Sequence, residues 1–223
     1  MNGTAILTSL ELALVTTIVL MAVGIPLAYW LAFSTRRWKF LVESVVALPL
    51  ILPPTVLGFY VLVSLGPLSP IGRLSERIFG TTLPFTFKGL VIASTLYSLP
   101  FAVQPIAAAF GSVNRRLIEA SWTLGVSRAG TFRRVIVPQS IAGLVTGAVL
   151  SFAHTIGEFG VVLMVGGNIE GQTRTISIAI YDDVQALNYA QANSTAVLLV
   201  LFSFAVLATV YGINRRVWTV TNS

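Results

Sequence analysis

The chain has 223 residues, of which 55% are hydrophobic and only 10% are charged, and its mean hydropathy is +0.85. Because soluble globular domains carry about 25% charged residues, this composition excludes a soluble enzyme or binding domain and predicts an integral membrane protein. The chain contains no cysteine and a single histidine, which excludes a disulfide framework and a multi-histidine metal site.

The length suits one domain, residues 1–223, with five or six membrane-spanning helices, since each helix needs about 20 apolar residues. We predict an all-α membrane domain with five spans, at residues 10–33, 44–65, 89–110, 139–157 and 194–213. A further uncharged run, residues 159–168, is too short to cross the bilayer alone. This run is either a re-entrant sixth segment or a continuation of the fourth span.

Prolines interrupt the second and third predicted spans. The second span contains Pro49, Pro53 and Pro54, which must break regular helix hydrogen bonding. Irregular backbone at membrane depth is stable only where protein or a water-filled cavity surrounds it. Pro53 and Pro54 are therefore candidates for a pathway wall, although a purely structural kink fits the sequence equally well. Gln104, a polar group inside the third span, is a further pathway candidate.

The net charge is +6, and the basic residues lie between the apolar runs. This placement is typical of membrane topology signals, so we expect no nucleic-acid partner. With the N-terminus outside and the C-terminus in the cytoplasm, the inner side holds most of the basic residues, as the positive-inside rule requires. They are Arg36, Arg37, Lys39, Arg115, Arg116, Arg128, Arg133, Arg134, Arg215 and Arg216. We predict a multi-pass protein of the plasma or inner membrane.

The loop at residues 113–138 carries the largest arginine cluster and reads as two short helices. Asn114 can cap a helix over residues 115–124, with Leu117, Ser121 and Leu124 on one stripe. Gly125 suits the left-handed position that ends a helix, Ser127 can cap the second helix, and Pro138 limits its length. Such a basic knob with an apolar face can dock into a groove on another protein. It can also lie on a lipid surface.

The spacing within this loop favours docking. Glu119, Ala120 and Ser121 are followed by three residues, Gly125, nine residues and Val135-Ile136-Val137-Pro138. This pattern closely resembles the cytoplasmic EAA loop of type I ABC importer permeases, in which E-A-A, three residues, glycine and nine residues precede I-x-L-P. Ser121 and the two valines are the departures, and both conserve volume approximately. The resemblance implies that the coupling residues to an ATPase are Glu119, Ala120, Ser121, Gly125, Val135 and Pro138.

The resemblance also implies the partners. Type I permeases have a five-helix core, pair as dimers and receive conformational force from cytoplasmic ATPases. We therefore expect a second copy of this chain, two ABC ATPase subunits, an external substrate-binding protein and the lipid bilayer as partners. The sequence contains no G-x-x-x-x-G-K-[ST] phosphate loop. ATP and Mg²⁺ are thus expected on the ATPase, and this chain is expected to be no enzyme and to hold no cofactor of its own.

Six further stretches, named at the end of this paragraph, bear on the substrate. Together they resemble the molybdate and tungstate branch of these permeases. The sulfate and thiosulfate permeases have two of the same features, the Gly-Glu-aromatic-Gly and the Gly-Asn-Ile stretches. Sulfate therefore remains the alternative substrate, and both are small tetrahedral dianions. The stretches are Leu48–Gly58, Ser98–Phe101, Gly157–Gly160, Gly166–Ile169, Thr173–Ile176 and Ala179–Tyr181.

Glu158, between Gly157 and Gly160, is the most informative acid, because a carboxylate near a span end is costly unless it is paired or wet. It is either a gate or docking residue or a structural hydrogen-bond acceptor for His154, Arg174 or the backbone. A relay through His154 and Glu158 would instead indicate a secondary transporter, but no internal repeat is visible. A membrane anchor without transport activity is a third alternative, against which the proline-broken spans argue.

Overall fold

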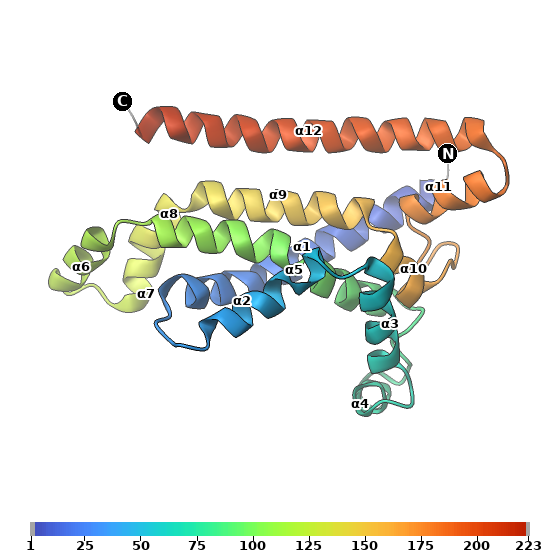
Figure 1. The fold of residues 1–223 in the computed structure, drawn as a ribbon, viewed down its shortest axis with the longest axis horizontal. Helices are drawn as coiled ribbons and strands as arrows, with labels where there is room; N and C mark the ends of the chain where they lie inside the picture. Colours follow the sequence, from blue (N-terminus) through green and yellow to red (C-terminus); the bar gives the residue numbers. More distant parts are fainter. Residues whose placement is uncertain (1–2, 222–223) are drawn as a thin grey trace.

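The computed structural model describes the backbone of residues 3–221 and the side chains of residues 3–78 and 80–212. All regular structure in this part of the chain is helical (Figure 1). The elements are α1 Gly3–Phe33, α2 Lys39–Ala47, the 3₁₀ turn η1 Leu48–Leu50, α3 Pro54–Leu65, α4 Pro70–Phe79, α5 Phe87–Ser112, α6 Arg115–Thr123, α7 Arg128–Thr131, the π-helical η2 Phe132–Ile136, α8 Val137–Gln139, α9 Ile141–Gly157, α10 Gly160–Gly166, α11 Ile176–Gln185 and α12 Tyr189–Thr221.

Three helices are long and apolar enough to cross a membrane: α1, α5 and α12. Two bent pairs pass the same test. One is α2 with η1 and α3, which turn by 110°, and the other is α7 to α8 with α9, which turn by 73°. If each bent pair is one span, the count reaches five, in agreement with the number predicted from hydropathy. The run at residues 159–168 forms only the short α10, which begins after a break at Glu158 and Phe159.

Proline accounts for the break in the second predicted span. The helix that begins at Lys39 tightens into η1 and stops, and α3 begins at Pro54. Pro53 has an extended backbone, with φ −54° and ψ 136°, because the residue before a proline is sterically excluded from the helical region. Pro54 then fits the first position of α3, where a backbone N–H would be unpaired in any case. The predicted kink is therefore present, and it is sharp.

The centre of the molecule is a bundle of α1, α5 and α9, in which small residues allow close contact. Gly24 of α1 lies against Ala102 and Val103, and Gly147 of α9 lies against the backbone of Ala102 and the side chain of Ile106. The helices of the loop, α6 to α8, gather at one end of this bundle, and α10 and α11 lie at the other end (Figure 1). Helix α1 begins at the α11 end of the bundle, opposite the loop.

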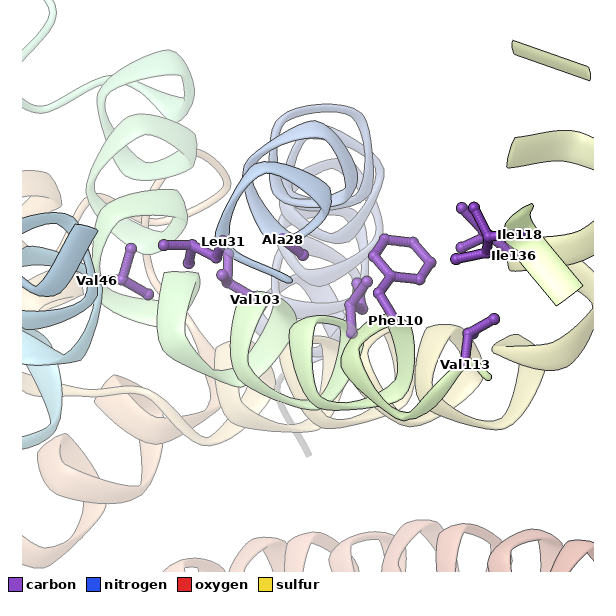
Figure 2. Close-up of a cluster of buried hydrophobic side chains, with 9 residues drawn as sticks. Ala28, Leu31, Val46, Val103, Phe110, Val113, Ile118 and Ile136 are labelled. Carbon is purple, nitrogen blue, oxygen red and sulfur yellow. The ribbon is translucent and has the colours of Figure 1, made fainter. Parts of the chain in front are cut away.

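A buried apolar cluster joins the bundle to the loop (Figure 2). Phe110 near the end of α5 is fully buried, and Ile118 of α6 and Ile136 of η2 belong to the same cluster. The loop helices are therefore packed into the body of the protein and do not form a free flap. The labelled members are Ala28, Leu31, Val46, Val103, Phe110, Val113, Ile118 and Ile136.

Two helices lie where the sequence analysis expected only connections. Within residues 66–88, α4 is capped by Ser69, whose Oγ accepts a hydrogen bond of 2.7 Å from the N–H of Gly72. Gly80 ends the helix at φ +69°. Ser-Pro at the start of a segment and glycine at its end are recognisable helix signals. The sequence analysis overlooked them because charged residues in the same segment suggested a polar connection. The second is α11, within the polar stretch at residues 169–193.

The contact between α5 and α9 yields a stability prediction. A Cβ added at Gly143 would overlap Ala109 and lie 2.9 Å from the carbonyl oxygen of Pro105. Neither atom can rotate away, so Gly143→Ala must push the two helices apart. We expect a loss of about 1–3 kcal/mol in stability, as in overpacked cores, measured by thermal unfolding in detergent. Gly212→Ala is the control, because no atom lies within 4 Å of its added Cβ; equal melting temperatures for the two variants would contradict the prediction.

Candidate functional site

The loop at residues 113–138 has the two-helix form predicted from its sequence. The Asn114 side chain accepts a hydrogen bond of 3.0 Å from the N–H of Arg116 at the start of α6. Gly125 follows α6 at φ +77°, in the left-handed region that favours glycine. Ser127 Oγ then accepts a hydrogen bond of 3.2 Å from the N–H of Gly130 and caps α7. The predictions for these three positions are confirmed.

A hydroxyl pair fixes the two loop helices against each other. Ser121 Oγ of α6 lies 2.9 Å from Thr131 Oγ1 of α7, and both side chains are buried. Thr131 Oγ1 also donates to the Ser127 carbonyl at 3.1 Å, so its single proton is used there and Ser121 is the donor of the pair. The residue that departs from the E-A-A pattern thus joins the two helices. The prediction that Leu117, Ser121 and Leu124 share one face of the helix is wrong for Ser121. Its side chain is buried, whereas Leu117 and Leu124 are exposed.

The outward face of the loop is apolar and basic. Leu124 is 82% exposed, Trp122 is 49% exposed and Leu117 is 46% exposed. Of the other predicted coupling residues, Glu119, Ala120, Gly125 and Pro138 are exposed and Val135 is partly buried. Large exposed apolar side chains close together are typical of a protein-binding surface.

Glu119 lies at the edge of a pocket between α6 and the end of α1. Its walls include Tyr29, Phe33, Arg115 and Arg128. Among the residues that the structure describes, no Lys, Arg or His nitrogen lies within 4.0 Å of the Glu119 carboxylate. The carboxylate therefore lacks the helix ion pair that its spacing from Arg115 would permit, and it is available to a partner.

At the opposite end of the bundle, α3 and α10 cross in close contact. A Cβ on Gly160 would lie 2.6 Å from Pro54 Cβ, and one on Gly58 would lie 2.8 Å from Met164 Cβ. The proline break and the Gly-Glu-Phe-Gly stretch, two pathway candidates far apart in sequence, therefore meet in space. Pro53 and Gly157 adjoin them.

Glu158 forms its hydrogen bonds with the backbone of α10. Its Oε1 accepts from the N–H of Val161 at 2.7 Å, and its Oε2 accepts from the N–H of Val162 at 3.0 Å. The residue is only 5% exposed. These N–H groups belong to the first turn of α10 and have no partner within the helix. The carboxylate thus satisfies two buried donors, which is the geometry of a structural acceptor.

His154 and Arg174 were the other partners considered for Glu158, but both form hydrogen bonds with other residues. His154 Nδ1 lies 2.9 Å from Ser98 Oγ, and the imidazole ring stacks on Phe101 with a centroid distance of 4.0 Å. Arg174 Nε donates to Asn168 Oδ1 at 2.6 Å. In the described part of the chain, no hydrogen bond or ion pair joins His154 to Glu158, so the two do not form a relay in this structure.

A compact turn brings together two stretches that the sequence analysis singled out for substrate identity. Thr173 is fully buried, and its Oγ1 donates to the Gly166 carbonyl at 2.7 Å and accepts from the N–H of Ile169 at 3.1 Å. Beside it, the Asn168 amide donates to both carboxylate oxygens of Asp182, at 3.0 and 2.8 Å. Asp182 was missed by the sequence analysis, although it is one of the few acids in an apolar chain.

Gln104 lies apart from the other pathway candidates. It is exposed in a cleft between α2 and α5, in the half of α5 nearer the loop. The six candidates therefore form one group of five at the α3–α10 crossing and one separate residue. Among the described residues, no group of three or more His, Cys, Asp or Glu side chains is placed to hold a metal ion.

Residues 24–219 match the model of the family described as binding-protein-dependent transport system inner membrane component. The chain belongs to this family. It is 53% identical to the molybdenum transport system permease protein ModB of Azotobacter vinelandii, over 95% of this chain and 93% of that protein. It is 38% identical to the protein of the same name from Escherichia coli K12, over 81% of this chain and 79% of that protein.

Solved structures share the fold at low sequence identity. A chain of a bacterial ABC transporter involved in the import of alginate matches with a TM-score of 0.75 and 18% identity, covering 96% of this chain and 78% of that one. A chain of the MetNI methionine ABC transporter in an inward-facing conformation matches with a TM-score of 0.72 and 20% identity, covering 97% and 96%. The importer-permease fold inferred from the sequence is therefore confirmed.

The contacts of Glu158 yield a prediction that separates structure from gating. Glu158→Gln keeps one oxygen acceptor and should retain most of the stability and transport activity. Glu158→Ala leaves the N–H groups of Val161 and Val162 buried without an acceptor, at a cost of about 1–3 kcal/mol for each group. We expect a clearly lower melting temperature and lower abundance for the alanine variant only.

Glu76→Gln is the control for this pair, because Glu76 is an exposed acid on α4. Thermal unfolding and transport are measured on the same preparations. If both Glu158 variants melted like the wild type and yet transported nothing, Glu158 would be a gate residue and not a structural acceptor.

Proposed function

We propose that the chain is the permease subunit of an ATP-driven importer that carries molybdate, and the chemically similar tungstate, into the cytoplasm. The observation that carries this proposal is the 53% identity over 211 residues with the molybdenum transport permease of Azotobacter vinelandii. Relatives from bacteria and from the archaeon Haloferax volcanii bear descriptions of the same kind. The stretches Thr173–Ile176 and Ala179–Tyr181 support the choice of molybdate over sulfate, since the sulfate permeases resemble this chain less in that region.

The loop geometry supports an ATPase as the cytoplasmic partner. Glu119 has no ion pair in the described part of the chain, and Leu124 is almost wholly exposed. An unpaired carboxylate among apolar side chains suits a groove that offers basic or backbone N–H groups. Because Ile118 and Ile136 anchor the loop in the core, a displacement imposed by the ATPase would reach α1 and α5.

The full assembly that we propose contains two copies of this chain, two ABC ATPase subunits and an external binding protein. The N-terminus is outside and the C-terminus is in the cytoplasm. ATP and Mg²⁺ bind the ATPase subunits, and this chain forms the pathway without catalysing a reaction. With one chain that supplies five spans, a twofold axis between two copies is the simplest place for the pathway.

Within each copy, the α3–α10 crossing is the proposed external part of the pathway. Regular helix stops at residues 51–53 and at residues 158–159, and Gly160 allows the two segments to touch. Glu158 holds the start of α10 in place. The carboxylate is not proposed as a substrate ligand, because it would repel a dianion.

The substrate is tested by deletion of this chain and complementation with it alone. We expect the deletion strain to lose most of its cellular molybdenum at limiting molybdate, because the remaining subunits lack a membrane pathway. Elemental analysis of washed cells measures the content. Unchanged molybdenum together with lost sulfate uptake would move the assignment to sulfate, and uptake by proteoliposomes with a proton gradient but no ATP would indicate a secondary transporter.

The coupling role is tested at Gly125. A β-branched residue at φ +77° costs about 1–2 kcal/mol in backbone strain, and the strain would misalign α6 and α7. We expect Gly125→Val to insert normally and yet lose most of the substrate-stimulated ATP hydrolysis of the reconstituted transporter. Gly171→Val is the matched control, because Gly171 has φ +74° and, like Gly125, open space around its Cβ. Equal hydrolysis by Gly125→Val and the wild type would contradict the coupling role.

A further inference from the structure

A polar cleft lies between α2 and α5 on the side of the molecule nearer the loop. Its volume is about 450 Å³. Leu31, Val46 and Val103 belong to the core cluster and form its floor (Figure 2). Small side chains keep the cleft open: Ala32, Ala47, Ala107, Ala108 and Gly111.

Three polar side chains line this otherwise apolar cleft. Lys39 Nζ lies 3.3 Å from Glu43 Oε1, one turn further along α2, with side-chain exposures of 31% and 51%. Gln104 faces them from α5 and is exposed. Its amide has no hydrogen-bond partner among the residues that the structure describes.

These residues indicate that the cleft contains water and does not face lipid. Gln104 lies about two turns before the end of a helix long enough to cross the membrane. Ionisable and polar groups at that depth are stable where they face the interior of an assembly or a water-filled cavity. The open face of the cleft therefore belongs to a pathway or to a contact with a second copy, and its empty volume favours the pathway.

We propose that this cleft is a weak oxyanion site at the cytoplasmic exit of the pathway. Lys39 and Gln104 donate hydrogen bonds to the anion, and Glu43 keeps its affinity low. The inference rests on the proposed function, since it requires a tetrahedral dianion as the substrate. It assigns the last contact of the anion before release to Lys39 and Gln104.

The chemistry of the three groups fits such a site. An ammonium group has three N–H donors, and one contact with Glu43 leaves two for the anion. The Gln104 amide contributes two further donors. A dianion beside Lys39 is attracted by the ammonium and repelled by the Glu43 carboxylate, so the two charges largely cancel. The anion is solvated but not retained, which suits a site that must release it to the cytoplasm.

Variants of this ion pair can report on transport, because we expect them to fold like the wild type. Partly exposed pairs of this kind contribute little to stability. Lys39→Gln removes the cation and leaves the Glu43 carboxylate unopposed, and we expect the uptake rate of reconstituted transporter to fall about fivefold or more, because the exit then repels the dianion. Glu43→Gln leaves the cation unopposed, and we expect molybdate to bind the permease–ATPase complex about fivefold more tightly and to leave it more slowly.

Arg37→Gln is the matched control, because it removes one positive charge from an exposed residue that does not line the cleft. Gln104→Leu, an apolar change in a span, should insert at least as well as the wild type and still reduce uptake. Uptake of radiolabelled molybdate and its binding without the external protein are measured for all four variants.

The outcomes separate this inference from the proposed function. If the wild type transported no oxyanion, the proposed function would be wrong. If the wild type transported molybdate but Lys39→Gln and Gln104→Leu both matched Arg37→Gln, the cleft would not be on the pathway. Unchanged molybdate affinity in Glu43→Gln would likewise overturn the role given to its carboxylate.

Discussion

In a lipid bilayer no water replaces a missing backbone hydrogen bond, so a helix break at membrane depth has to be surrounded by protein or by a water-filled cavity. The breaks at residues 51–53 and 158–159 lie at one site, where Pro54 contacts Gly160 and each break shields the other. The Glu158 carboxylate pairs with the first N–H groups of α10. This arrangement allows irregular backbone to persist in a membrane protein.

The same bundle connects this crossing with the loop at the far end. Tyr29 of α1 and Phe110 of α5 both pack their rings against Phe132 of η2, at centroid distances of 5.4 and 5.9 Å. The loop therefore holds the inner ends of two central helices, whose outer halves pack near α10. Even a small displacement of the loop would have to move both helices, because packed side chains resist local deformation.

Local sequence signals predicted the local structure well. Hydropathy identified five apolar stretches, and the residues Asn114, Gly125 and Ser127 have the capping geometry expected of them. The contacts between distant segments could not be predicted, because periodicity identifies a buried face but not its neighbour. The partners of Glu158, the separation of Gln104 from the other candidates and the burial of Ser121 all depend on such contacts. The helix α4 was missed for a different reason, since its charged face concealed good capping signals.

The hydroxyl pair in the loop also limits which substitutions the loop can accept at positions 121 and 131. Ser121 and Thr131 are ten residues apart and share one buried hydrogen bond. Alanine at position 121, as in the family pattern, would remove the donor and leave a small void beside Thr131. A compensating change at position 131 would then be favoured, such as a residue that fills the void without a hydroxyl. The two positions are therefore coupled through one contact, and a related loop grafted onto this chain has to carry a matched pair of residues there.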